Sequence, residues 1–170
     1  MLPFLLRGVT VFSMPGHKEL LLEFQELALS ARNAESLMQT MTERLHQAVS
    51  RYNWVGFYLV AKDDPGVLVV GPHTGSFTPN IRIPLDRGLC GAAASTGRKV
   101  VVDDVTKDPR YIQGSDLVKS EMVVPIFAGK KLIGELDVES YFSGTFTAQE
   151  QQFVEACAAL VSRYCEKNPQ

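Results

Sequence analysis

Cysteine is scarce in this sequence, and the spacing of the few cysteines excludes two kinds of site. There are three among 170 residues, with no Cys-x-x-Cys pair and no group of His and Cys at zinc-binding spacing. An odd, low count argues against a disulfide framework and favours a reducing, cytoplasmic environment. Cys157 and Cys165 share one expected helix and would lie about 12 Å apart along its axis, too far for a disulfide. We therefore expect no disulfide, no metal and no cofactor.

Long apolar runs and an excess of charge of either sign are also missing. Lys and Arg number 17 and Asp and Glu number 19, which gives a formal net charge of −2. No basic surface for nucleic acid is expected from this balance. The apolar stretches are too short to cross a bilayer. At this length, the composition is typical of a single soluble globular domain.

The first residues form the one unusual segment. Met1 to Phe12 is apolar, but it lacks the basic leading region and the small-residue cleavage site of a signal peptide. We expect residues 1–16 to form an extension, either a disordered tail or a dimer surface. A single domain would then span residues 17–167.

Helical periodicity marks both ends of this domain. Apolar residues recur at three- and four-residue spacing from His17 onward, and again after Asn33, which is a suitable N-cap. A last helix is expected after Thr147, where Thr147 and Glu150 have the spacing of a capping box. Cys157 falls on the apolar stripe of that helix, so we expect it to be a core residue.

The middle of the chain has the alternation and β-branched content typical of strands. We expect strands at 53–61, 67–71, 81–84, 99–102, 121–127 and 131–141, a short helix at 88–96, and loops at 72–80 and 103–119. The connections are too short for crossovers, so neighbouring strands should pair antiparallel. This order predicts an α+β fold with helices packed on an antiparallel sheet.

Acidic residues share one face of the last expected strand. In L-I-G-E-L-D-V-E-S, alternation places Glu135, Asp137 and Glu139 together, opposite the apolar residues. Glu121 begins the preceding strand and could join them. The row is either a solvated face or a set of carboxylates lining a cleft. In a dry cleft, like charges about 7 Å apart would raise at least one pKa, and a neutral acid could donate a proton to an oxyanion.

Two further features can be interpreted in two ways. Trp54 and Tyr58 share strand parity and could form either an aromatic wall or part of the core. Cys90 lies in the first turn of the short helix, where the macrodipole and free N–H groups would lower the pKa of a thiol. Alternatively, Cys90 is one of the small residues that allow this helix, G-L-C-G-A-A-A-S-T, to pack closely on a sheet.

Several blocks resemble a GAF domain, most closely the branch that contains free methionine-(R)-sulfoxide reductase. They are N-W-V-G-F-Y-L, I-P-L-D-R-G-L-C-G-A-A-A, D-D-V, S-E-M-V-V-P-I, G-K-K-L-I-G-E-L-D-V-E-S and F-T-A-Q-E. They follow in order between about Leu20 and Glu166. The resemblance implies a GAF/PAS-like fold with a six-stranded antiparallel sheet flanked by helices, a small-molecule pocket on one face, and often a homodimer.

The resemblance also implies a ligand site. Glu121, Asp137 and Glu139 match the carboxylates that bind the sulfoxide in that family, although the reductases usually carry Asp where this chain has Glu139. Trp54 and Tyr58 match the aromatic wall that packs on the methionine side chain.

The cysteines of that family are only partly present. The reductases use three, and only the middle one is kept, as Cys90. The attacking cysteine falls on Gly114 and its usual resolving partner on Asn80. Sulfoxide reduction needs one thiol to attack sulfur and another to resolve the sulfenate.

Two functions are therefore open. The sequence favours a non-catalytic GAF module, a sensor whose acidic and aromatic pocket binds a methionine-like or other small polar metabolite. The alternative is a divergent, thioredoxin-dependent free methionine-(R)-sulfoxide reductase acting through Cys90. Neither would bind nucleic acid or a membrane. The sequence lacks the Asn-Lys…Phe…Asp-Glu signature of cyclic-nucleotide-binding GAF domains. It also lacks a His beside Cys90, which covalent attachment of a bilin would need.

Overall fold

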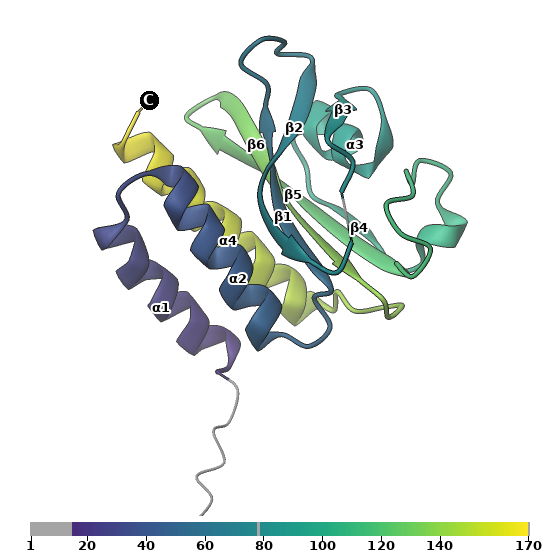
Figure 1. Ribbon diagram of the computed structural model, residues 1–170, viewed down its shortest axis with the longest axis horizontal. Coiled ribbons are helices and arrows are strands. Elements are labelled where there is room, and N and C mark those ends of the chain that lie inside the picture. Colours follow the sequence, from purple (N-terminus) through teal and green to yellow (C-terminus); the bar gives the residue numbers. More distant parts are fainter. Residues whose placement is uncertain (1–14, 78, 170) are drawn as a thin grey trace, which may run out of the picture.

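The structure, a computed structural model, describes residues 15–77 and 79–169 and is built on a six-stranded sheet (Figure 1). The strand order is β3-β2-β1-β6-β5-β4, and every neighbouring pair is antiparallel. The strands are β1 (Trp54–Val60), β2 (Val67–Gly75), β3 (Arg82–Pro84), β4 (Val100–Val102), β5 (Ser120–Ala128) and β6 (Lys131–Ser140). The predicted α+β fold with a six-stranded antiparallel sheet is confirmed.

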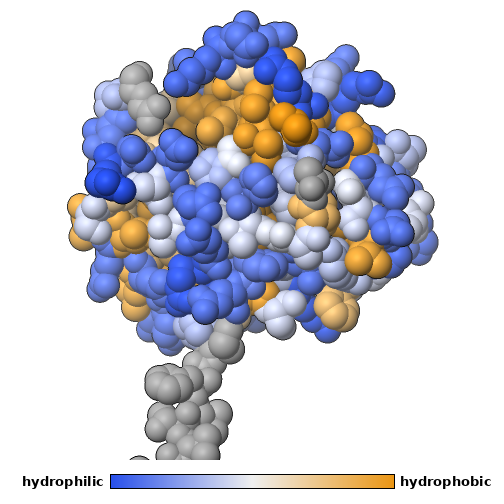
Figure 2. Space-filling view, in the orientation of Figure 1, coloured by the Kyte–Doolittle hydropathy of each residue, from blue (hydrophilic) through white to orange (hydrophobic). Residues whose placement is uncertain are grey.

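Helices cover the two faces of the sheet unequally. On one face lie α2 (Ala34–Ala48) and α4 (Ala148–Lys167), with α1 (His17–Ser30) packed against them (Figure 1). The other face carries α3 (Gly88–Thr96) and the long loops, including the 3-10 turn η1 (Val105–Lys107). In Figure 2, hydrophilic residues predominate over α1 and α2, and apolar residues gather toward the top of the view, where Figure 1 shows β6 and β2. None of the helices in the described part of the chain is long and apolar enough to cross a membrane.

Strand alternation divides the core into two clusters. In β1, Val55 and Phe57 join the helix-side cluster, whereas Trp54 and Tyr58 join the cluster beneath α3. Because successive side chains of a strand point to opposite faces, each central strand contributes to both. The face beneath α3 is therefore buried as well. Polar side chains on this face are removed from water.

Of the two hydrogen bonds that a capping box would place at the start of α4, one is present. Thr147 accepts a hydrogen bond from the backbone N–H of Glu150, as predicted. The Glu150 carboxylate does not reach back to the cap. It accepts a hydrogen bond from the hydroxyl of buried Tyr52 and lies 3.2 Å from Nε2 of His17. The reciprocal capping box occurs instead at α2, between Asn33 and Ser36.

Strand β2 is longer than predicted. Pro72 begins a stretch rich in Gly, Pro, Ser and Thr, which predicts that the strand ends at Gly71, but the strand continues to Gly75. The pairing with β1 shifts register between Gly56 and Tyr58, opposite the position of Pro72. A bulge tolerates a proline, which has no N–H for the ladder, so the strand continues past it.

A close approach of β6 to β1 gives a stability prediction. A Cβ at Gly134 would lie 2.3 Å from the backbone oxygen of Tyr58, which the sheet holds in place. We expect Gly134→Ala to lower the free energy of unfolding by about 1–3 kcal/mol, measured by urea denaturation. Gly66→Ala is the control, because its Cβ would meet only the Asp64 side chain, at 3.2 Å. Equal stability of the two variants would contradict this packing.

The prediction of an extension over residues 1–16 falls almost entirely on residues 1–14, outside the described residues. Helix α1 begins at His17, next to this segment.

Candidate functional site

Four acidic side chains lie together on the sheet face beneath α3. Glu135, Asp137 and Glu139 come from alternate positions of β6, and Glu121 comes from β5, where it pairs in register with Glu139. Their side chains are all buried: Glu135 is 0% exposed, Asp137 2%, Glu121 5% and Glu139 8%. The solvated-face interpretation is therefore wrong, because α3 and the loops cover this face.

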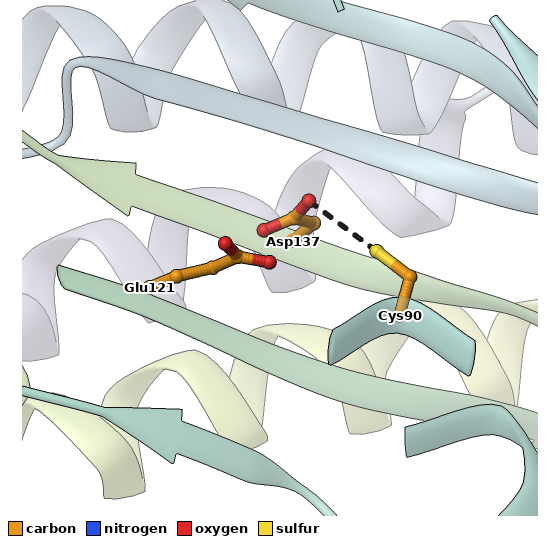
Figure 3. A group of neighbouring side chains, drawn as sticks. All are labelled: Cys90, Glu121 and Asp137. Atoms are coloured by element: carbon orange, nitrogen blue, oxygen red, sulfur yellow. Dashed lines mark hydrogen bonds between the residues drawn. The ribbon is translucent and has the colours of Figure 1, made fainter. Parts of the chain in front are cut away.

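Helix α3 brings Cys90 onto the same carboxyls. Its thiol donates a hydrogen bond to Oδ2 of Asp137 at 3.6 Å (Figure 3). One ligand atom each of Cys90, Glu121 and Asp137 lies within 4.8 Å of the other two. Glu139 lines the same cavity, so we call Cys90, Glu121, Asp137 and Glu139 the acidic cage.

Burial dominates the electrostatics of this cage. It raises the pKa of Glu121, Asp137 and Glu139 well above their ordinary values, and the neighbouring carboxyls raise them further. Burial also raises the pKa of Glu135, to about 8, although the Cys90 thiol acts to lower it. A cluster of this kind retains protons at neutral pH because it cannot ionise fully in a dry environment.

The prediction that the start of α3 lowers the pKa of Cys90 is wrong. Burial, followed by the charges of Asp137, Glu135 and Glu121, raises the pKa of this thiol well above its ordinary value. Arg87, the N-cap residue, does not line the cavity of the cage. The helix start therefore does not offset the rise in the pKa of Cys90 that burial and the surrounding acids cause.

The aromatic residues lie on the cage side, but only one reaches its cavity. Tyr58 lines it and donates a hydrogen bond from its hydroxyl to the backbone oxygen of Asn80 at 2.9 Å. Trp54 is fully buried beside it, with ring centroids 6.0 Å apart, and also stacks on His73 and Phe77. The indole N–H of Trp54 has no hydrogen-bond partner among the described residues. An orphaned buried donor of this kind is costly unless a bound group accepts from it.

The cavity of the cage is small. Its volume is about 20 Å³, and it is lined by Tyr58, Asn80, Ile83, Gly88, Leu89, Cys90, Ile112, Glu121, Asp137 and Glu139. Two larger depressions of about 590 and 540 Å³ lie between α1 and α4 and beside α3, and neither contains a predicted site residue. We place the candidate site at the small cavity because the chemically reactive groups converge there.

Of the other positions singled out in the sequence, only one lines this cavity. Asn80 lines it, whereas Gly114 does not, and a Cβ at Gly114 would come 3.0 Å from the ring of Phe77. Cys157 is buried in the helix-side cluster and Cys165 is half-buried beside it. Cys90 is thus the only cysteine at the cavity.

Sequence reasoning missed Leu89 and Ile112 as lining residues. Leu89 was not distinguishable from the other small or apolar residues of α3. Ile112 lies in an irregular loop that carries no periodic signal, so only its position in the fold reveals its role.

Comparison with known proteins identifies the family to which the fold belongs. Residues 33–164 match the GAF domain family. The free methionine-R-sulfoxide reductase of Saccharomyces cerevisiae is 34% identical over 114 residues, covering 66% of this chain and 63% of that protein. The Escherichia coli protein of the same name is 28% identical over 141 residues, 83% of each chain.

A solved structure extends the comparison to three dimensions. The free methionine-R-sulfoxide reductase from Neisseria meningitidis, in complex with its substrate, superposes with a TM-score of 0.82 at 31% identity and covers 88% of each chain. The order of the strands and these matches agree. The chain belongs to the GAF domain family.

Proposed function

We propose that the acidic cage binds free methionine-(R)-sulfoxide and reduces it to methionine through Cys90. The observation that carries the proposal is the position of the Cys90 thiol, in one cavity with three buried carboxyls and in contact with one of them. A thiol beside proton-bearing acids has the two groups that the oxygen-transfer step of sulfoxide reduction requires.

The relatives support this proposal over the non-catalytic module that the sequence alone favoured. Proteins named free methionine-R-sulfoxide reductase match this chain in sequence and in structure. Glu121, Asp137, Glu139, Trp54 and Tyr58 would then act as ligand-binding residues, with Cys90 as the catalytic one.

The first step transfers oxygen from the sulfoxide to the thiol. Because its pKa is raised, Cys90 is protonated at rest, and Oδ2 of Asp137 is placed to accept its proton as the sulfur attacks. The pKa of Asp137 is raised as well, so Asp137 passes the proton that it retains to the neighbouring carboxyl that protonates the sulfoxide oxygen. Glu121 or Glu139, retaining a proton, donates it to the sulfoxide oxygen. The sulfoxide S–O bond breaks, its sulfur gains two electrons and leaves as methionine, and the Cys90 sulfur loses two electrons and becomes a sulfenic acid.

The second step needs thiols from outside the cage, because no second cysteine lines it. One external thiol condenses with the sulfenic acid, forming a mixed disulfide and releasing water. A second thiol attacks that disulfide, releases reduced Cys90 and leaves as an external disulfide. A thioredoxin-type dithiol supplies both thiols, and the reducing cytoplasm expected from the sequence would provide it.

Substrate entry requires the cage to open. A cavity of about 20 Å³ accommodates a water-sized group and not an amino acid. Asn80 and Ile112 belong to the two irregular segments of the lining, so we propose that these segments move apart when the sulfoxide binds.

A second candidate is binding without turnover, favoured by the residues at two positions. Asn80 and Gly114 stand where the family resemblance places a resolving and an attacking cysteine. The domain would then serve as a sensor for a methionine-like metabolite, with a homodimer as its expected signalling unit.

One paired experiment separates the two candidates. The reductase proposal predicts thioredoxin-dependent NADPH oxidation when methionine-(R)-sulfoxide is added, and none with the (S) epimer. Binding is followed separately through the fluorescence of Trp54, the only tryptophan. Saturable binding without NADPH oxidation would contradict the reductase and support the sensor, and Glu121→Gln should weaken binding in either case.

A further inference from the structure

We propose that Cys90, Glu121 and Asp137 form a site for one divalent cation of the zinc class. The inference goes beyond the proposed reductase, because binding an ion requires no turnover. The site also predicts that the ion and methionine-(R)-sulfoxide compete for binding, because both would use the same side chains.

The distances fit a tetrahedral ion. With Zn–S near 2.3 Å and Zn–O near 2.0 Å, a sulfur and an oxygen on one tetrahedral ion stand roughly 3.5 Å apart. Cys90 Sγ and Asp137 Oδ2 are 3.6 Å apart, and one carboxyl oxygen of Glu121 lies within 4.8 Å of Cys90 Sγ and of one carboxyl oxygen of Asp137. Figure 3 shows the three side chains converging from α3, β5 and β6. The Glu121 oxygen would have to move closer to the other two ligand atoms for all three to bind one ion.

The carboxyls at this site lack partners that would satisfy them. Oδ1 of Asp137 and Oε2 of Glu139 have no hydrogen-bond partner within residues 15–77 and 79–169, and Asp137 is 2% exposed. In the same part of the chain, no Lys, Arg or His forms an ion pair with any of the cage acids. Buried carboxyls without such partners retain their protons, and a bound cation would replace those protons and supply the positive charge that this cluster lacks.

The size of the cavity favours an ion over a larger guest. About 20 Å³ holds one water-sized occupant, and Glu139 lines the same space. An ion therefore fits the closed cage without the movement that an amino acid requires. Glu139 or a water molecule would complete a set of four ligands.

The donor set selects the kind of metal. A thiolate is a soft ligand that favours zinc and cobalt, whereas magnesium and calcium prefer six or more oxygens. Sequence spacing gave no sign of this site and predicted no metal. The three ligands come from separate elements, so they form no short motif of the kind that zinc fingers show.

Cobalt titration tests the proposal on the full chain. The protein is reduced, stripped with a chelator and titrated with Co²⁺ alone. We expect one ion per chain, with the intense near-ultraviolet band of a thiolate–cobalt bond, and Zn²⁺ should abolish that band by displacement. Cys90→Ser should remove the band, and Glu121→Gln should weaken binding by about tenfold or more.

Cys165→Ser is the matched control, because that half-buried thiol lies on α4, away from the cage. It should keep both the band and the affinity. Far-ultraviolet circular dichroism establishes that each variant is folded. Absence of saturable binding in the wild type, or a band that survives in Cys90→Ser, would overturn the metal site. Neither result would bear on sulfoxide turnover, which is measured with chelator present.

Discussion

Replacing Cys90 with serine is expected to lower turnover of methionine-(R)-sulfoxide by about 10³-fold or more, because it removes the atom that accepts the oxygen. Serine keeps the size of the side chain and can still donate a hydrogen bond to Asp137. Binding of the sulfoxide, measured by Trp54 fluorescence, should therefore change by only about threefold. A loss of turnover with binding retained assigns Cys90 to the chemical step.

The control for this substitution is again Cys165→Ser. That thiol is half-buried beside the helix-side cluster and should have no part in the reaction. Its variant should retain wild-type turnover. Turnover that persists in Cys90→Ser, or that disappears in Cys165→Ser, would refute the assignment.

The second large effect concerns Glu135 and the dependence of the unfolding free energy on pH. Glu135 is fully buried, and neither of its carboxyl oxygens has a hydrogen-bond partner among the described residues. Burial raises the pKa of Glu135 from 4.5 to about 8. The folded protein therefore retains a proton that the unfolded chain releases above about pH 4.5, so stability is fully present below that pH and is lost as pH rises toward 8.

Glu135→Gln should remove this pH dependence. At 1.36 kcal/mol per pKa unit, the wild type loses about 3 kcal/mol between about pH 4 and pH 7 through this one group, and a neutral amide loses none. The unfolding free energy of the variant should therefore rise by about 3 kcal/mol relative to wild type over that range, measured by urea denaturation of chelator-treated protein. The titratable groups around Glu135 are Cys90 from α3, Tyr58 in register on β1, Glu121 on β5 and Asp137 on its own strand.

An exposed carboxyl provides the reference for this measurement. Glu26→Gln changes a residue on the surface of α1 and should leave the pH dependence as it is in the wild type. Parallel stability curves for wild type and Glu135→Gln would show that Glu135 ionises in the folded protein as readily as in the unfolded chain.

The sequence predicted most of the fold because periodicity is local. Alternation along β6 placed Glu135, Asp137 and Glu139 on one face, and helical spacing identified α1, α2 and α4. It placed the end of β2 wrongly, because the bulge that accommodates Pro72 depends on pairing with β1. The residue pattern along one strand does not indicate where its pairing with another strand shifts register.

The sequence predicted which residues form the candidate site, but it did not predict how deeply they are buried. Alternation and the family resemblance named Cys90, Glu121 and Asp137. They did not reveal that α3 closes over the carboxyls. That closure raises the pKa of the Cys90 thiol where the helix start alone would lower it, and it reduces the cavity to the size of a water molecule. Both consequences arise from contacts between segments far apart in the sequence.

A single-turnover experiment tests the oxygen transfer most directly. Reduced, chelator-treated protein is mixed with methionine-(R)-sulfoxide in the absence of any external thiol. We expect about one methionine released per chain and a dimedone adduct on the peptide that contains Cys90, formed from its sulfenic acid with loss of the transferred oxygen as water. Sulfoxide that binds and is recovered unchanged, or a dimedone adduct on Cys157 or Cys165 instead, would contradict oxygen transfer to Cys90.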